Sequence, residues 1–370
     1  MLRTLLAAAF VLTAGCSSAK PSLADAAAPA DLSASLAAAD FAARDSGSPV
    51  IIIGGGDSGA ADDGGQASCA LTASGVWLDF IDAVVVAMRA SGNAGSEALA
   101  PPAVADRDAF AARVVAILGG DETQACALPA SYRLMHLGGL RVIAEIDATG
   151  KPSPALFWGT YAAPITTPTP SRRLAIEAPH PIFDANTEHQ AADVFAQSGA
   201  RWFLLAGAHR CADAAASGCD GTTTACSTAA EDYRVSDAAH ATQLPFWAVH
   251  AQLSQLDAQL LFIQLHGNSD ACPSALVSDG SGSWSDSDAA GQLAAALVAR
   301  SVAVGKCGAG YPTATCTLCG TDNVEGRFTA GAADACTMLG TTYGRFVHIE
   351  QQPALRTSYQ PLIDAVNATF

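Results

Sequence analysis

The sequence predicts an α/β fold in which a central, mixed and largely buried sheet is sandwiched by helices. Short apolar runs of strand length alternate along the chain with segments of helical periodicity. The strand runs are apolar on both faces, as in sheets that helices cover on both sides. Cys- and Gly-rich connections at 207–238 and 305–342 are expected to lie over the strand ends as disulfide-stabilised loops.

Six segments have the apolar spacing of amphipathic helices. They are 77–89, 107–118, 191–197, 246–260, 293–302 and 355–366. The third is predicted to begin at Thr187, whose hydroxyl suits a helix N-cap. Six further segments have the length and composition of strands, namely 141–146, 156–161, 174–178, 202–206, 260–265 and 346–349.

Residues 1–16 are typical of a bacterial lipoprotein signal peptide. Arg3 precedes an apolar stretch that is too short to span a bilayer. The segment Leu-Thr-Ala-Gly-Cys at 12–16 resembles the lipobox, whose Cys16 would carry the lipid. By resemblance to the bacterial sorting rule, Ser17 favours the outer membrane, with the protein facing the periplasm or the surface. The alternative is an ordinary secretory signal with an incidental cysteine.

The rest of the chain divides into a tether and one domain. Ala, Ser, Asp, Pro and Gly dominate 17–68, which is the composition of a linker. No second linker and no internal repeat occur in 69–370, so we expect a single α/β hydrolase-like domain there. The formal net charge of −16 argues against nucleic acid as a partner, since phosphate neutralisation requires clusters of Lys and Arg. The expected partners are a small-molecule or peptide substrate and, through Cys16, a membrane.

The cysteines favour disulfides. The chain has eleven, and ten remain when Cys16 is set aside. An even number in an exported chain indicates disulfide bonds, although the sequence does not predict their pairing. The alternative is a structural zinc held by Cys316 and Cys319 together with Cys307 and Cys336. A single C-x-x-C without a second pair at the proper spacing is a weak zinc signal.

Two histidines stand where predicted strands end. His180 follows the strand at 174–178, and His266 follows the strand at 260–265. Ligands in open α/β sheets collect outside the carboxyl ends of the strands. Glu188, in the first turn of a helix, can point back toward His180. The sequence therefore predicts that His180, Glu188 and His266 hold a catalytic Zn²⁺ with water in the fourth position, and Asp184 is the competing carboxylate.

Glu350, at the end of the strand at 346–349, is the predicted catalytic base. Zinc would lower the pKa of its bound water to about 7 and polarise a substrate carbonyl. Glu350 would take the proton of that water and give it to the leaving amine, unless it pairs with a surface arginine instead. Arg210 is a candidate for a second cation that stabilises the oxyanion or holds a substrate carboxylate. His240 could lie over the site, or Asp237 could cap a helix-entry turn there.

Short motifs in the same order over about residues 170–355 resemble the N-formylglutamate amidohydrolases and, more distantly, the zinc carboxypeptidases and aspartoacylase-like hydrolases. They are Ala-Pro-His at 178–180, Asn-Thr-Glu-His-Gln at 186–190, Leu-His-Gly at 265–267, Asn-Val-Glu-Gly-Arg-Phe-Thr-Ala-Gly at 323–331, Tyr-Gly at 343–344 and His-Ile-Glu at 348–350. The resemblance implies a zinc-exopeptidase-like (phosphorylase/hydrolase-like) fold with a mixed eight-stranded sheet, one catalytic zinc, and Arg327 as the second cation. Val324 and Glu325 interrupt the Asn-Gly-Arg-Phe run of the family.

These observations predict an exported, lipid-anchored, zinc-dependent amidohydrolase or carboxypeptidase-like enzyme. It would hydrolyse a C–N bond of an N-acyl amino acid or a small peptide. The alternative is a non-catalytic surface lipoprotein that reuses the fold to bind a ligand or a cell-wall component. A disulfide-rich structural surface protein without metal is a third possibility. No G-x-S-x-G motif occurs, so serine hydrolysis is not expected.

Overall fold

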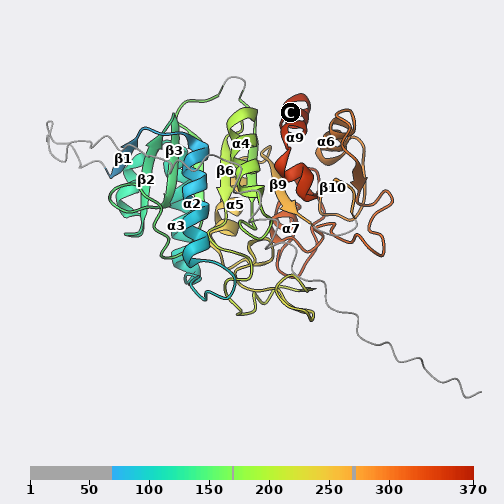
Figure 1. Cartoon of the computed structure of the whole chain (residues 1–370), viewed down its shortest axis with the longest axis horizontal. Coiled ribbons are helices and arrows are strands. Elements are labelled where there is room, and N and C mark those ends of the chain that lie inside the picture. Colours follow the sequence, from blue (N-terminus) through green and yellow to red (C-terminus); the bar gives the residue numbers. More distant parts are fainter. Residues whose placement is uncertain (1–68, 169–170, 269–271) are drawn as a thin grey trace, which may run out of the picture. The chain divides into compact units, whose positions relative to one another are not determined.

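The computed structural model describes residues 69–168, 171–268 and 272–370 (Figure 1). The predicted signal peptide at 1–16 with Cys16, and the predicted tether at 17–68, lie outside the described residues.

The described residues form a mixed ten-stranded sheet with the order β1-β2-β3-β4-β6-β5-β9-β12-β10-β11, together with a two-stranded sheet of β7 and β8. The strands are β1 (Ala70–Ala73), β2 (Tyr132–Leu137), β3 (Leu140–Glu145), β4 (Thr160–Pro164), β5 (Leu174–Ala178), β6 (Trp202–Leu205), β7 (Thr222–Thr223), β8 (Glu231–Asp232), β9 (Leu261–Gly267), β10 (Ala275–Ser278), β11 (Val304–Lys306) and β12 (Phe346–Gln351). The four central strands β6, β5, β9 and β12 are parallel to one another. Their carboxyl ends therefore lie at the same edge of the sheet.

Helices cover both faces of the sheet (Figure 1). The first face packs against α2 (Trp77–Ser91), α4 (Thr187–Ser198), α6 (Ala289–Val298) and α9 (Gln360–Thr369). The second face packs against α3 (Val104–Leu118) and α5 (Pro245–Leu256). The shorter helices are η2 (Glu122–Ala127), η3 (Ala238–His240), α7 (Val324–Thr329) and α8 (Pro353–Thr357).

Strand β9 shows how the sheet separates a purely apolar face from a partly polar one. Because side chains alternate along a strand, Leu261, Ile263 and Leu265 enter the core under α2, α4, α6 and α9. Phe262, Gln264 and His266 point to the opposite face, and all three are buried. The polar side chains of the central strands therefore lie on the side of the sheet that α3 and α5 cover.

The predicted fold class is confirmed, but the sheet is larger than the family resemblance implied. It has ten strands instead of eight. The sequence did not indicate β1, β2, β10 or β11, since three of them have only three or four residues. The remaining one, β2, carries Arg133 and His136, which interrupt its apolar character.

The strand predicted at 156–161 was largely wrong, because β4 begins only at Thr160. Phe157 and Gly159 have positive φ angles of 59° and 108°, which no strand accepts. The buried carboxylate of Glu145 accepts hydrogen bonds from the backbone N–H groups of Leu156 and Trp158, at 2.6 and 3.1 Å. These backbone N–H groups therefore donate to a side chain, whereas in a strand they would donate to the backbone of a neighbouring strand.

The helix predicted at 355–366 is divided into α8 and α9. Pro361 lies in the first turn of α9, where a proline is tolerated at a helix start but would break a helix interior. The helix predicted to end at residue 260 ends at Leu256, because Asp257 is extended, with φ −130° and ψ 99°. Asn186, in a left-handed conformation, occupies the N-cap position that was predicted for Thr187.

The ten cysteines of the described residues are all paired, as predicted. The disulfides are Cys69–Cys126, Cys211–Cys226, Cys219–Cys336, Cys272–Cys316 and Cys307–Cys319. The two cysteines of the C-x-x-C motif bond to different partners, so the alternative of a structural zinc does not hold. Five disulfides fit an extracellular or periplasmic protein. Separately, the described part of the chain contains no helix with the length and apolarity to cross a bilayer.

Replacement of Ile263 by alanine should lower the free energy of unfolding by about 2–5 kcal/mol. Ile263 is fully buried in β9, between Ile176 of β5 and Val347 of β12. Urea unfolding with the disulfides intact measures the loss. Val86→Ala is the control, because Val86 is 51% exposed on α2 and its truncation should change stability by less than about 0.5 kcal/mol. Equal effects of the two substitutions would contradict the packing described.

Candidate metal centre

His180 and Asp184 lie on a tight turn between β5 and α4. The turn is closed by backbone hydrogen bonds from Asp184 N to His180 O and from Thr187 N to Asp184 O, both 3.0 Å. Ile182 and Asn186 adopt positive φ angles of 72° and 74°, which fold the segment back on itself. The Asp184 carboxylate is thereby brought against the His180 ring.

His266 reaches the same point from the end of β9, and three ligand atoms converge there. His180 Nδ1 lies 3.1 Å from Asp184 Oδ2 and 3.2 Å from His266 Nδ1. His266 Nδ1 lies 3.7 Å from Asp184 Oδ2. The three residues are 1–3% exposed, so almost no solvent reaches these atoms.

The outer nitrogen of each histidine is held by a hydrogen-bond acceptor. His180 Nε2 lies 2.8 Å from Asp237 Oδ1, and His266 Nε2 lies 2.7 Å from Gln264 Oε1. A carboxylate or carbonyl on the outer nitrogen fixes the tautomer and turns the other nitrogen into the metal ligand. Both Nδ1 atoms then direct lone pairs toward Asp184. Three acceptors of this kind repel one another unless a cation, either a proton or a metal ion, lies among them.

The cluster fits a metal ion such as zinc. With bonds of about 2.0–2.1 Å, the ligand atoms of a tetrahedral zinc lie about 3.3–3.4 Å apart. The three observed separations of 3.1, 3.2 and 3.7 Å bracket that value. Two imidazoles and one carboxylate also form a usual donor set for catalytic zinc.

Asp237 connects several side chains of the surrounding polar network. Its Oδ1 also faces His240 Nδ1 at 2.9 Å, and its Oδ2 accepts from Arg210 Nε at 3.0 Å. Burial acts to raise the pKa of Asp237, but Arg210, His240 and His180 outweigh it and hold the pKa well below its usual value. Asp237 is therefore a permanent anion that can orient His180.

The two cations around Asp237 are stabilised in turn. Burial acts to lower the pKa of Arg210, and the carboxylates of Asp237, Asp184 and Glu350 raise it. The pKa of His240 is likewise raised by Asp237 and Asp322 against the effect of burial. Tyr233 stacks on the His240 ring at 3.7 Å between ring centroids. Arg210 is thus electrostatically coupled to Asp184 of the candidate metal cluster.

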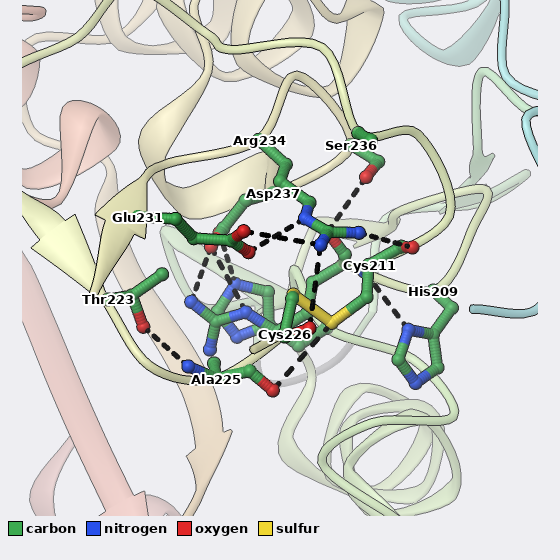
Figure 2. Close-up of a disulfide and its surroundings, with 12 residues drawn as sticks. His209, Cys211, Thr223, Ala225, Cys226, Glu231, Arg234, Ser236 and Asp237 are labelled. Atoms are coloured by element: carbon green, nitrogen blue, oxygen red, sulfur yellow. Dashed lines mark hydrogen bonds and ion pairs between the residues drawn. A yellow bond between two sulfur atoms is a disulfide. The ribbon is translucent and has the colours of Figure 1, made fainter. Parts of the chain in front are cut away.

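A disulfide-bonded loop carries Arg210 and Asp237 to the site. In Figure 2, the guanidinium of Arg234 joins Glu231 to the backbone oxygens of Cys211 and Cys226 beside their disulfide. Ser236 donates a hydrogen bond to the backbone oxygen of Arg210 at 2.7 Å. These contacts fix both ends of the loop segment that bears the two charged residues.

Glu350 and His348 extend the cluster along β12. Glu350 is the register partner of His266, and its Oε1 lies 3.5 Å from His348 Nε2. Glu350 is 6% exposed and lies beside His266 and His348. Burial, followed by the charges of neighbouring histidines, lowers the pKa of His348 to about 3 and that of His266 well below its usual value. Both imidazoles are neutral at neutral pH, as metal ligands and hydrogen-bond acceptors must be.

Two of the predicted residues make other contacts in this structure. Among the described residues, Glu188 belongs to none of the three groups that could hold a metal, and its Oε1 is 4.0 Å from Arg89 Nη2. Arg327 binds Asp220 Oδ1 at 2.5 Å, Thr321 O at 2.9 Å and Cys336 O at 3.0 Å. These partners fasten the loop that carries the Cys219–Cys336 disulfide. The competing ligand Asp184 contacts His180 directly, and the second cation candidate Arg210 binds Asp237, which also contacts His180.

Sequence reasoning did not identify Asp237 or Gln264 as part of the site. Asp237 was considered only as a helix cap, and its side chain makes no such bond to η3. Gln264 stands two residues before His266 on the same strand face, a spacing that could have indicated it. For His240, the interpretation that placed it over the site agrees with its contact to Asp237.

No family model matches the chain, and no curated protein matches it. Among solved structures, it is similar to a crystal structure titled a "putative metallopeptidase" from Shewanella amazonensis SB2B. The identity is 10%, the match covers 57% of this chain and 79% of that chain, and the TM-score is 0.30. A TM-score this low carries no argument about function. The interpretation of the site therefore depends on its own geometry.

The metal-free protein should lose stability as the pH falls from about 6.5 toward about 3, in part through His348. Across this window the unfolded chain binds a proton at His348 that the folded chain does not. The free energy of unfolding should therefore fall by up to about 1.4 kcal/mol for each unit of pH decrease. Above the pKa that His348 has in the unfolded chain, stability should no longer depend on this residue's protonation. Urea unfolding at about pH 7.5 and about pH 5 should show a smaller loss for His348→Gln than for wild type. An identical pH dependence in both proteins would contradict this assignment.

Proposed function

We propose that this protein is a zinc-dependent hydrolase of C–N bonds, with His180, Asp184 and His266 as the metal ligands. The observation that carries the proposal is the convergence of two imidazole Nδ1 atoms and one carboxylate oxygen, 3.1–3.7 Å apart, in a buried cluster. The hydrogen bonds of the outer nitrogens to Asp237 and Gln264 support it, because they select the tautomers that bind metal.

The proposal takes Asp184, rather than Glu188, as the carboxylate ligand. Asp184 Oδ2 is within 3.7 Å of both histidine nitrogens. Glu188 is buried in the first turn of α4 and faces Arg89. Its carboxylate can stabilise the positive end of the α4 dipole without binding metal.

Glu350 is the proposed general base. Bound zinc supplies the Lewis acid that polarises a substrate carbonyl and lowers the pKa of a water to about 7. The Glu350 carboxylate, opposite His266 in the β9–β12 register, accepts a proton from the attacking water. The same carboxylate returns the proton to the leaving amine nitrogen, so that the C–N bond breaks without releasing an amide anion. His348 Nε2, 3.5 Å from Glu350 Oε1, helps to orient the carboxylate.

Arg210 is the proposed second cation. Its side chain is 11% exposed, and its ion-pair partner Asp237 is shared with His180 and His240. A guanidinium near the cluster can stabilise negative charge that develops on the carbonyl oxygen, or bind a carboxylate of the substrate. N-acyl amino acids and small peptides carry both groups, and they are the substrate class we propose. A lipid on Cys16 and an outer-membrane location, facing the periplasm or the surface, complete the proposal.

Zinc analysis by plasma mass spectrometry tests the ligand set. Wild-type protein purified without chelator should contain about one zinc per chain. His180→Ala, His266→Ala and Asp184→Asn should each lose most of it, whereas the matched control Glu188→Gln should keep it. Circular dichroism verifies that each variant is folded. The absence of zinc from folded wild type, even after zinc is added back, would refute the metal centre.

Glu350→Gln separates a hydrolase from a non-catalytic binding lipoprotein. The variant should retain zinc and lose hydrolysis of N-acyl amino acids or peptides by about 10²–10⁴-fold, because a general base is removed while the ligands remain. Turnover is followed by release of the free amine. Full activity of the variant would exclude Glu350 as the base. A wild-type protein that binds zinc but hydrolyses neither substrate class would favour the binding lipoprotein.

A further inference from the structure

A chain of buried hydrogen bonds leads from His266 to Glu177 on the neighbouring strand. Gln264 stands between them, since it is the register partner of Glu177 in the parallel pair of β5 and β9. His266 Nε2 lies 2.7 Å from Gln264 Oε1, and Gln264 Nε2 lies 3.0 Å from Glu177 Oε2. The three side chains belong to residues that are 0–3% exposed.

The Gln264 amide can adopt only one orientation in this environment. Its NH₂ group faces the carboxylate of Glu177, with Oε2 at 3.0 Å, and the carboxyl group of Glu325, with Oε2 at 3.4 Å. Its oxygen faces Asn323 Nδ2 at 2.5 Å. Asn323 is itself oriented, because its Oδ1 accepts a hydrogen bond from Gly326 N at the start of α7. A flipped Gln264 would place its NH₂ group against the NH₂ group of Asn323 and its oxygen against the Glu177 carboxylate, and Gln264 is fully buried.

The orientation of Gln264 determines the tautomer of His266. The Gln264 oxygen can only accept, so His266 must carry its proton on Nε2. Nδ1, which faces His180 and Asp184, is then unprotonated. The protonation state of a candidate metal ligand is thus set by a carboxylate two side chains away.

Glu177 is the fixed acceptor at the end of this chain. Its second oxygen, Oε1, faces His250 Nδ1 at 2.7 Å, and His250 Nε2 lies 2.7 Å from Thr329 Oγ1. Burial and the nearby charge of Glu177 raise the pKa of Glu325 well above its usual value. Glu177 therefore accepts hydrogen bonds at both oxygens, while Glu325 beside it is neutral.

We propose that Glu177 is a positioning residue for the metal centre, which holds Gln264 in the one orientation that leaves Nδ1 of His266 ready to bind metal. This inference rests on the proposed metal ligands, but it concerns a buried residue that touches neither metal nor substrate.

Glu177→Gln tests the proposal with little change in side-chain volume. The oxygen of the new amide would accept from His250, so its NH₂ group would meet the NH₂ group of Gln264. Gln264 would flip and donate to His266 Nε2, which moves the imidazole proton to Nδ1. Zinc affinity, measured by competition with a chromophoric chelator, should fall about 10–100-fold. In the metal-free variant, the ¹⁵N chemical shifts of His266 should change from the Nε2–H to the Nδ1–H tautomer.

The reciprocal exchange Glu177→Gln with Gln264→Glu should restore binding. In this double variant the amide at position 177 donates to the carboxylate at 264, and that carboxylate accepts from His266 Nε2. The hydrogen bond between positions 177 and 264 is reversed, but the bond in which position 264 accepts from His266 Nε2 keeps its wild-type direction. The total charge is also that of wild type. Zinc affinity should return to within about threefold of wild type, and the His266 shifts should return to the Nε2–H pattern.

Glu145→Gln is the matched control. Glu145 is also a buried glutamate of the sheet, and its carboxylate accepts from Tyr132 and from backbone N–H groups after β3. Its loss should lower stability but leave zinc affinity and the His266 tautomer unchanged.

The outcomes separate this inference from the proposed function. Unchanged zinc affinity and an unchanged tautomer in Glu177→Gln would overturn the role of Glu177 and leave the hydrolase proposal intact. Weakened binding that the double variant does not restore would also overturn it, because the loss would then be one of packing. A wild-type protein without zinc affinity would refute the hydrolase, whereas the tautomer measurement would still test Glu177.

Discussion

The parallel hydrogen bonding of β5, β9 and β12 is the constraint on which the rest of this structure depends. It brings the carboxyl ends of the three strands to one edge, so that His180, His266 and Glu350 meet although they are far apart in the sequence. The register matters as much as the direction. A shift of one residue in β9 would turn Gln264 and His266 into the apolar core under α4 and α9, and would turn Leu265 into the site.

The site is an extended polar network on the second face of the sheet, rather than an isolated ligand triangle. The Asp237 carboxylate makes hydrogen-bond contacts with His180, Arg210 and His240, and the Gln264 oxygen makes one with His266. Burial makes every unpaired polar atom in such a network costly, by about 1–3 kcal/mol each. The network therefore specifies proton positions, which is a requirement for ligands that must present lone pairs to a cation.

The sequence predicted the strand-borne part of the site and less of the loop-borne part. The strand at 174–178 has the predicted bounds, because a short apolar run between turn residues has few alternatives. His180 and His266 follow from their positions after such runs. The preference for Glu188 depended on an ordinary helix start, and the positive φ angles of Ile182 and Asn186 that bring Asp184 inward have no sequence signature in non-glycine residues. Asp237 is positioned by a disulfide-bonded loop, whose pairing the sequence does not contain.

The Cys219–Cys336 disulfide joins the loop that carries Arg210 and Asp237 to the loop that follows α7. The strand-borne ligands, by contrast, require only the sheet. We therefore expect maturation in two stages, in which the sheet first brings the histidines together and oxidation then fastens the charged groups over them. Production in a reducing compartment would be expected to yield a folded but imperfectly oriented centre, and oxidative refolding would be the step that completes it.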